Sequence, residues 1–440
     1  MINWSSLSAN EQQAALARPA NADAAGLSAT VANIVEAVKA RGDEAILEYT
    51  RKFDCPTLQN LVLSDSDWDK LAAQVDESVK QALIEAYDNI KAFHSAQMPD
   101  SVVMDTTQGV VCEQHYTALE SVGLYVPGGT APLPSTVLML GIPATVAGCP
   151  RRILCTPPNN SGLIAPEIAY AAKLCGVQKI FLCGGAQAIA GMAYGTQSIP
   201  KADKLFGPGN SFVTEAKQQV SQTPEGAAID MPAGPSEVLV LADENANPVF
   251  VAADLLSQAE HGHDSQAVLV TNSSALIGAV KREVDNQLAK LARAEITAKA
   301  MQHARYILTD SVAKAIDVSN RYAPEHLIVQ LDDAVALLPS IKNAGSIFVG
   351  PWSPESAGDY ASGTNHVLPT YGYSKNHSSL GLVDFMRRYT VQTLSQTGIR
   401  YLGPTIMTLA KSEGLTAHEN AVKVRLDALD NKDSWSGKYD

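Results

Sequence analysis

The feature that most constrains the fold is a regular alternation of short β-branched runs and helical segments between residues 122 and 349. Each run has the length of a strand and ends at Gly, Pro or polar residues. It then leads into a segment with apolar residues spaced three and four apart. This alternation is typical of βα units, in which successive strands run parallel because a helix crosses back over the sheet. We therefore expect parallel sheets covered by helices.

The alternation forms two blocks in series. The predicted strands are 152–156, 179–183, 237–242, 267–271, 306–308, 327–331 and 346–349, and the predicted helices between them are 165–175, 186–194, 248–261, 274–293, 311–322 and 334–343. Periodicity also predicts helices over 29–41 and 66–92, near 385–396 and 404–412, and over 419–429. After Pro351 the chain becomes polar and glycine-rich, and we expect few strands there.

These patterns predict an α/β protein with two Rossmann-like parallel-sheet domains of incomplete type and small helical N- and C-terminal domains. Its 440 residues suffice for about three domains. The C-terminal region after about residue 373 is poor in apolar residues, so we expect it to pack on a neighbour or a second subunit.

Composition excludes several classes of partner. The formal net charge of −13 disfavours nucleic acid and anionic lipid surfaces. The N-terminus has no basic and apolar signal segment, and the longest apolar stretch, 135–149, is broken by Gly141 and Pro143, so no membrane span is expected. The six cysteines show no paired spacing and are expected to be reduced thiols of a cytoplasmic protein.

Gln258 and His261 stand near the end of the predicted helix 248–261, for which Asn247 is the expected N-cap and Gly262 the stop. Residues three apart share a helix face, so the two side chains could supply two ligands to one metal ion. A solvated helix end is the alternative, because Gln-x-x-His alone is not a specific pattern.

Asp359 and His418 complete a candidate zinc set. Asp359 lies in the glycine-rich polar loop 355–366, and His418 just precedes the last predicted helix. Gln, His, Asp and His form a mixed oxygen and nitrogen set that suits zinc or a similar divalent ion. The ligands come from distant segments, so their spacing permits a metal site without establishing it. His263 follows the helix stop and is expected at the surface.

Glu325 and His326 follow Pro324 and open a predicted strand. A carboxylate and an imidazole are the side chains best suited to proton transfer near neutral pH. Neighbours on a strand point to opposite faces, however, and ligands of open α/β sheets lie at the carboxyl ends of strands. Charges at the edge of a strand therefore remain an alternative.

Three glycine-rich turns are candidates for a dinucleotide site: Tyr125-Val-Pro-Gly-Gly129, Gly184-Gly-Ala-Gln187 and Phe206-Gly-Pro-Gly-Asn210. Each could let a phosphate approach backbone N–H groups. The G-x-G-x-x-G fingerprint is absent, and any one of the turns could be an ordinary tight turn. Three in one block favour a dinucleotide modestly.

Seven motifs together resemble histidinol dehydrogenases. They are Val122-Gly-Leu-Tyr-Val-Pro-Gly-Gly129, Gly184-Gly-Ala-Gln187, Phe206-Gly-Pro-Gly-Asn210, Ala233-Gly-Pro-Ser-Glu237, Leu255-Leu-Ser-Gln-Ala-Glu-His261, Tyr322-Ala-Pro-Glu-His326 and Gly358-Asp-Tyr-Ala-Ser-Gly-Thr-Asn-His366. The resemblance runs in order from about residue 30 to residue 425.

The resemblance implies zinc-dependent, four-electron oxidation of L-histidinol to L-histidine through L-histidinaldehyde with two NAD molecules, the last step of histidine biosynthesis. It implies one zinc ion per subunit, held by Gln258, His261, Asp359 and His418, and a catalytic pair, Glu325 and His326. The implied substrate-binding residues are Ser236, Gln258, His261, His326, Asp359, His366, Glu413 and His418, and the implied NAD contacts are Tyr125, Gln187 and Asn210. It also implies a homodimer in which the C-terminal segment, with Glu413 and His418, completes the partner's active site. The domain division expected with this resemblance is a helical segment 1–25 packing with the C-terminal region, a first α/β domain from 26–120 and 236–372 with the catalytic and metal residues, a second, NAD-binding α/β domain 121–235, and a helical dimerisation region 373–440.

These roles are chemically coherent. Zinc would orient the amine and imidazole nitrogens of the substrate, His326 would accept the alcohol proton, and Glu325 would activate water for attack on the aldehyde. Three alternatives are a zinc hydrolase, which would not reduce NAD, a related dehydrogenase for another small alcohol, and a non-catalytic metal-binding scaffold. His366 and Glu413 argue against the second, because they match positions that contact histidinol.

Overall fold

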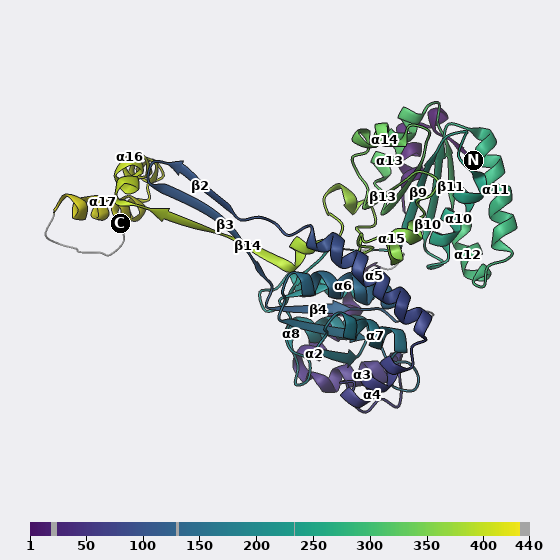
Figure 1. Ribbon diagram of the computed structural model, residues 1–440, viewed down its shortest axis with the longest axis horizontal. Helices are drawn as coiled ribbons and strands as arrows, with labels where there is room; N and C mark the ends of the chain where they lie inside the picture. The colour runs from purple at the N-terminus through teal and green to yellow at the C-terminus, as the bar shows by residue number, and fades with distance from the viewer. Residues whose placement is uncertain (19–23, 129–131, 233, 432–440) are drawn as a thin grey trace. The chain divides into compact units, whose positions relative to one another are not determined.

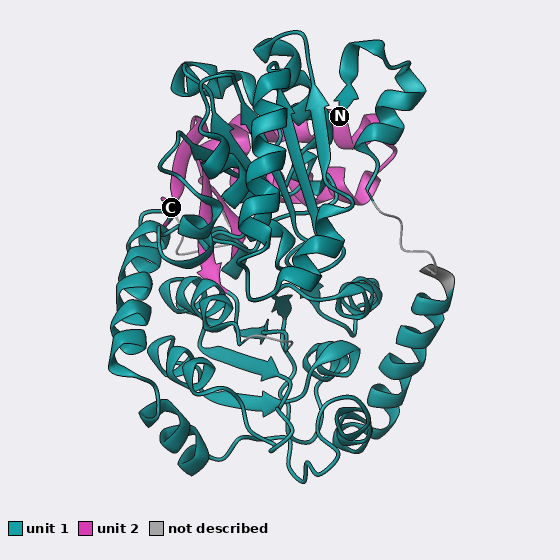
Figure 2. Cartoon of the chain, turned by 90° about the vertical axis from the view of Figure 1, so that its right-hand side faces the viewer, with its two compact units in different colours: residues 1–97, 119–385 teal, residues 98–118, 386–440 magenta. Residues whose placement is uncertain are grey.

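The computed structural model describes residues 1–18, 24–128, 132–232 and 234–431; Gly129 and Ala233 of the predicted motifs lie outside these ranges. The chain divides into two compact units (Figure 2). Unit 1 comprises residues 1–97 and 119–385, and unit 2 comprises residues 98–118 and 386–440. No helix of the described chain is long and apolar enough to span a membrane.

Unit 1 contains a six-stranded parallel sheet, here called sheet A. Its strand order is β1 (Ile2–Asn3), β11 (Arg305–Leu308), β10 (Gln266–Thr271), β9 (Glu237–Ala242), β12 (His326–Gln330) and β13 (Ser346–Val349). The helices that follow its strands are α10 (Pro248–Ala259), α11 (Ser274–Leu288), α12 (Ala294–Met301), α13 (Val312–Tyr322), α14 (Ala334–Leu337), the 3-10 turn Leu338–Ser340, and α15 (Glu355–Tyr360). The predicted strands of this block are confirmed, and so are the predicted helices 248–261, 274–293 and 311–322, with ends that differ by a few residues. The predicted helix 334–343 is instead a short α-helix followed by a 3-10 turn that ends at Ser340, and α12 was not predicted.

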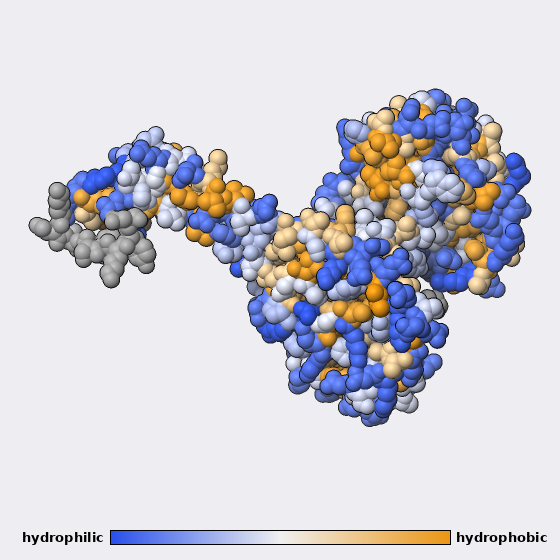
Figure 3. Space-filling view, viewed as in Figure 1, coloured by the Kyte–Doolittle hydropathy of each residue, from blue (hydrophilic) through white to orange (hydrophobic). Residues whose placement is uncertain are grey.

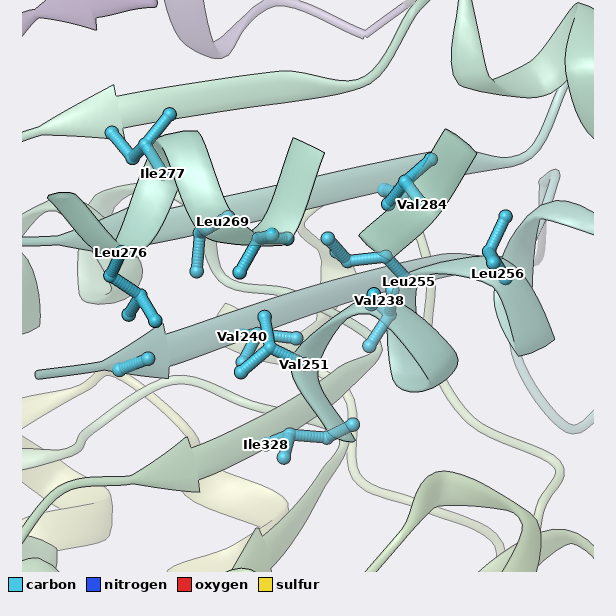
Figure 4. Packing of buried hydrophobic residues seen from close by; sticks show 14 of the residues in the cluster. Val238, Val240, Val251, Leu255, Leu256, Leu269, Leu276, Ile277, Val284 and Ile328 are labelled. Carbon is cyan, nitrogen blue, oxygen red and sulfur yellow. The ribbon is translucent and has the colours of Figure 1, made fainter. Parts of the chain in front are cut away.

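Both faces of the central strands β10, β9 and β12 of sheet A are buried, which explains why these strands are apolar without alternation. On one face Val238 and Val240 of β9 pack against Val251 and Leu255 of α10 (Figure 4). On the other face Leu239 and neighbouring strand residues pack against α13 and the N-terminal segment. A rigid, close-packed layer of this kind fixes the strand ends from which functional side chains project.

The N-terminal segment is held on sheet A. It consists of β1, the 3-10 turn Trp4–Ser6 and α1 (Ala9–Leu16), and Trp4 is fully buried. Arg305 donates hydrogen bonds to the carbonyl oxygens of Ala15 and Ala17. Contact of this segment with the C-terminal region stays a prediction.

A second parallel sheet of unit 1, sheet B, has five strands. Its order is β6 (Lys179–Leu182), β5 (Arg151–Thr156), β4 (Ser121–Tyr125), β7 (Lys204–Phe206) and β8 (Ala228–Ile229). Its helices are α6 (Pro134–Val146), α7 (Pro166–Leu174), α8 (Gly185–Tyr194) and α9 (Ser211–Ser221).

Four helices that follow the N-terminal segment pack around sheet B. They are α2 (Ala24–Arg41), α3 (Asp43–Phe53), α4 (Asp65–Ala73) and α5 (Glu77–Ser95), and they contact helices α6 to α9 (Figure 1). The apolar stripes of these helices predict that the helices are buried but do not indicate which sheet buries them. The predicted grouping of residues 26–120 with 236–372, like the other predicted domain boundaries, stays a prediction.

Unit 2 is built on an antiparallel sheet of β2 (Val102–Thr107), β3 (Val110–Ala118) and β14 (Met386–Leu394), with helices α16 (Gln396–Ser412) and α17 (Thr416–Asp430). The helix predicted near 385–396 is wrong, because β14 pairs along its whole length with β3. The hairpin β2–β3 was also missed. Unit 1 closes before β14 with the 3-10 turns Tyr373–Lys375 and Leu382–Phe385.

Candidate active site

The candidate site lies at the amino edge of sheet A, the edge at which its strands begin. Glu237 is the first residue of β9 and His326 the first of β12, and these two strands are neighbours. In a βα unit the helix runs back against the strands, so the carboxyl end of α10, with Gln258, reaches the same edge. The site therefore lies at the amino edge and not at the usual carboxyl edge, because its residues come from the starts of β9 and β12 and from the end of α10.

Asp359 joins two imidazoles at this edge. One of its carboxylate oxygens lies 3.9 Å from His261 Nε2, and the other lies 3.6 Å from His326 Nε2. These are ion-pair distances, too long for hydrogen bonds. His261 lies just beyond the end of α10 rather than on it, because the helix ends at Ala259. The predicted shared helix face is thus replaced by a turn that places His261 beside Asp359.

Gln258 is fully buried against the same group. With its amide nitrogen turned inward, the side chain donates to the Glu237 carbonyl oxygen at 3.1 Å and to Glu355 Oε1 at 3.0 Å, and it lies 3.1 Å from His326 Nδ1. The predicted ligand Gln258 and the predicted base His326 are therefore direct neighbours.

Glu355 is a site residue that the sequence analysis missed. It begins α15, is 1% exposed, and with His261 and Asp359 offers ligand atoms that lie within 4.8 Å of one another. Its Oε1 lies 3.6 Å from His326 Nδ1. Glu355 stands four residues before Asp359, one helical turn, and this spacing was the available signal.

Glu325 and His326 face each other, with 3.8 Å between Glu325 Oε2 and His326 Nδ1. Glu325 lies in a bend before β12, so the alternation of a strand does not separate the two side chains. The bend follows Ala323, whose left-handed backbone (φ 55°) ends α13. The expectation that neighbours on a strand must diverge therefore does not apply here.

The electrostatics of this cluster couple its members. Burial raises the pKa of Glu325 to about 8, while His326 acts in the opposite direction. Burial also raises the pKa of Glu355 to about 8. Burial lowers the pKa of His326, but the surrounding carboxylates, with Glu355 first, raise it well above the ordinary value. Several carboxylates so close together in a buried place favour a cation among them.

Ser236 and His366 lie beside the cluster. The Nδ1 of His366 lies 2.8 Å from the Asp359 carbonyl oxygen, and its Nε2 lies 3.2 Å from Thr136 Oγ1 of α6. One pocket of unit 1 is lined by residues that flank both sheets: Gly207, Lys217 and Asp230 come from the sheet B side, and Ser236, Glu325 and His366 from the sheet A side. Two of the predicted substrate residues, Ser236 and His366, thus share a pocket with the glycine-rich turn after β7.

The predicted NAD contacts lie at the opposite kind of edge, where the strands of sheet B end. Tyr125 ends β4, Gln187 is in the first turn of α8, and Asn210 caps α9 by accepting from the N–H groups of Phe212 and Val213. The Tyr125 hydroxyl accepts from Gly185 N–H at 3.1 Å. In the sheet order β4 and β7 flank the switch point, where such sheets bind dinucleotides.

Glu413 and His418 belong to unit 2. Glu413 caps the end of α16 and His418 is in the first turn of α17, and both are exposed. The remaining predicted ligands, catalytic residues and cofactor contacts belong to unit 1.

Comparison with known proteins gives a single answer. A family model for histidinol dehydrogenase matches residues 17–426. The chain belongs to the histidinol dehydrogenase family. It is 54% identical to the histidinol dehydrogenase of Vibrio parahaemolyticus over 97% of this chain and 98% of that protein, and 55% identical to that of Colwellia psychrerythraea over 97% and 98%. The crystal structure of histidinol dehydrogenase from Elizabethkingia anophelis matches with a TM-score of 0.93 and 46% identity over 98% of both chains.

Family membership identifies the chain as an oxidoreductase of the final step of histidine biosynthesis. The zinc hydrolase and the non-catalytic scaffold, which the residues alone left open, are thereby set aside. The α/β fold with parallel sheets is confirmed by the same structural match.

Proposed function

We propose that this chain oxidises L-histidinol to L-histidine through L-histidinaldehyde, with zinc and two molecules of NAD. The observation that carries the proposal is the pocket in which Glu325 and His366 meet the Gly207 turn of sheet B. A dehydrogenase must bring its proton acceptors and its nicotinamide to the same carbon, and this pocket joins the two edges that would supply them.

The donors at the amino edge fit a zinc ion. Gln258, His261 and Asp359 supply oxygen and nitrogen ligands, and His418 of unit 2 is the proposed fourth. Among the described residues, Glu355 Oε2 is a buried atom without a hydrogen-bond partner, as expected of a carboxylate next to a cation site. A bound zinc ion would supply orientation of the substrate's nitrogen atoms.

The proton transfers are assigned to two side chains. In the first oxidation His326 accepts the proton of the alcohol as its carbon loses a hydride to NAD. Glu325 then accepts a proton from water as the water oxygen bonds to the aldehyde carbon, and protonated His326 returns its proton to the former carbonyl oxygen, which gives the hydrate. In the second oxidation His326 accepts the proton of the resulting hydrate as the second hydride leaves. Its buried Nε2 has no hydrogen-bond partner among the described residues, so it is available for this transfer.

NAD is proposed to bind at the carboxyl edge of sheet B, against Tyr125, Gln187 and Asn210. The amino ends of α8 and α9 point to this edge, and helix amino ends favour phosphate groups. Gly207 has a φ of 127°, and a Cβ there would lie 2.1 Å from the Tyr125 carbonyl oxygen, so the turn requires glycine.

A homodimer with shared active sites is part of the proposal. Unit 2 exposes large apolar side chains on its strands, among them Val103, Met104 and Tyr389, and Figure 3 shows apolar surface over this sheet. A second copy of the chain is the proposed occupant of this surface, with Glu413 and His418 entering its site. A reducing, cytoplasmic location is also proposed, because all six cysteines are free and five are buried.

The direct test is stoichiometric. Purified protein is incubated with zinc, NAD and L-histidinol, and the NADH formed is counted against the histidine released. A ratio of about two supports the four-electron reaction. A ratio near one would contradict the second oxidation, and no NADH would reject the proposal. Activity lost on chelation and restored by zinc is the expected companion result.

A further inference from the structure

Glu237 holds both proposed catalytic residues through its backbone. Its N–H donates to Glu325 Oε2 at 2.8 Å, and its carbonyl oxygen lies 3.0 Å from His326 Nδ1. The backbone of one residue thus sets the position of the carboxylate and the orientation of the imidazole. Any shift at the start of β9 moves both groups together.

The side chain of Glu237 is itself fixed by Arg18. Arg18 Nε donates to Glu237 Oε1 at 2.5 Å and Arg18 Nη2 donates to Oε2 at 2.8 Å, which is the two-pronged geometry that only arginine provides. The backbone N–H of Tyr371 donates to the same Oε1 at 2.8 Å. The Glu237 side chain is 2% exposed and that of Arg18 is 14% exposed, so the pair is shielded from solvent.

Arg18 also binds the turn that precedes the catalytic pair. Its Nη2 donates to the carbonyl oxygens of Tyr322, at 2.9 Å, and Ala323, at 3.3 Å, and its guanidinium lies 4.0 Å from the centre of the Tyr322 ring. Ala323 has the left-handed conformation that ends α13 just before Glu325. One guanidinium therefore joins the residue that orients the pair to the turn from which the pair projects.

We propose that Arg18 is a positioning residue for Glu325 and His326, acting through Glu237 and the Ala323 turn without touching the substrate. The proposal rests on the catalytic roles assigned to that pair above. It gives the N-terminal segment a part in the reaction, because β1 and buried Trp4 anchor this segment to sheet A. Arg18 stands 219 residues from Glu237 in sequence, so no local motif marks it.

The test compares Arg18→Met, Arg18→Lys and the matched control Arg321→Met. Arg321 also ties the N-terminal segment to α13, through Gln12 Oε1 at 2.8 Å and the Trp4 ring at 5.1 Å, but it makes no contact with Glu237. For zinc-loaded enzyme we expect Arg18→Met to lower kcat about 10- to 100-fold, as losses of orienting partners do, with the KM values for histidinol and NAD nearly unchanged. Arg321→Met should keep the wild-type kcat.

Arg18→Lys keeps the positive charge but cannot form the two parallel hydrogen bonds to Glu237, so we expect a kcat between those of wild type and Arg18→Met. Guanidinium ion added to Arg18→Ala should restore part of the kcat, whereas methylammonium should not. An Arg18→Lys variant with wild-type kcat, or equal losses in Arg18→Met and Arg321→Met, would overturn the proposal. An inactive wild-type enzyme would instead reject the proposed function, so the two failures are distinguishable.

Discussion

Sheets A and B share one topology but use opposite edges. In each sheet the chain forms a central strand first, then two strands in succession on one side of it, and then a strand on its other side. The strands in this order are β9, β10, β11 and β12 in sheet A, and β4, β5, β6 and β7 in sheet B. Sheet B presents its glycine-rich turns at the carboxyl edge, whereas sheet A presents Gln258 and His326 at the amino edge.

The difference has an electrostatic reason. At a carboxyl edge helices begin, and their free N–H groups favour anions such as phosphates. At an amino edge helices end, and their free carbonyl groups favour cations. Sheet B therefore suits a dinucleotide, and sheet A suits a metal ion surrounded by carboxylates such as Asp359 and Glu355. A protein that needs both can use one topology twice.

The largest effect should come from the amino edge. His326→Asn is expected to lower the rate of both oxidations by about 10² to 10⁴, because it removes the only side chain assigned to both proton transfers. The measurement is single-turnover NADH formation from histidinol and from histidinaldehyde, in protein whose melting temperature and zinc content match wild type. Retention of either oxidation at the wild-type rate would contradict the assignment.

Glu325→Gln should separate the two half-reactions. Water activation belongs only to the second oxidation, so we expect aldehyde oxidation to fall by about 10² or more while alcohol oxidation falls far less. The amide keeps an oxygen that can accept the Glu237 N–H bond, so the geometry of the turn is preserved. Accumulated or trapped aldehyde is the readout, and equal losses in both half-reactions would count against this division of labour.

A smaller effect is expected at the carboxyl edge of sheet B. Gly207→Ala should raise the KM for NAD by about tenfold, about 1.4 kcal/mol, because the new methyl group would strike the Tyr125 carbonyl oxygen. Zinc affinity should not change. Gly148→Ala is the control, since Gly148 also has a positive φ of 85° but nothing within 4 Å of its Cβ position. If Gly207→Ala lost zinc but kept the wild-type KM for NAD, the assignment of NAD to sheet B and of zinc to sheet A would be contradicted.

The smallest effect concerns a half-buried carboxylate outside the candidate site. Burial raises the pKa of Asp54, at the end of α3, to about 6, and its Oδ2 is buried without a hydrogen-bond partner among the described residues. Its pKa is higher in the folded state than in the unfolded state, so its ionisation reduces stability as pH rises from about 4 to about 6. Asp54→Asn should therefore raise the melting temperature at about pH 8 and raise it less at about pH 5. A gain that is larger at the lower pH would contradict this.

Much of the fold could be predicted from the sequence. Strands 237–242 and 346–349 were predicted to the residue, because each is a short, largely apolar run that ends at Gly or at a polar residue. β14 was taken for a helix because Met386-Arg-Arg-Tyr-Thr-Val-Gln-Thr-Leu394 is a strand only when β3 pairs with it. The partner strand β3 is distant in sequence, so the local periodicity of residues 386–394 carries no information about it.

The candidate site divides in the same way. The residue types of Gln258, His261, Asp359, Glu325 and His326 indicated metal binding and proton transfer, and the family resemblance assigned their roles. Arg18 was missed because its contact with Glu237 joins residues that are distant in the chain. Glu355 was missed because its contact with His326 is also distant in sequence, and because a polar loop did not suggest that its side chain is buried.

By itself the sequence determined the two βα blocks and the chemistry available to them, since hydrophobic periodicity and residue type are local properties. Only the tertiary structure decided that Glu325 and His326 face each other. The left-handed turn at Ala323 keeps Glu325 out of the strand, and the backbone of Glu237 in the neighbouring strand binds both side chains. Hydrogen bonds across 88 and 89 residues of sequence arise only when β9 and β12 lie side by side.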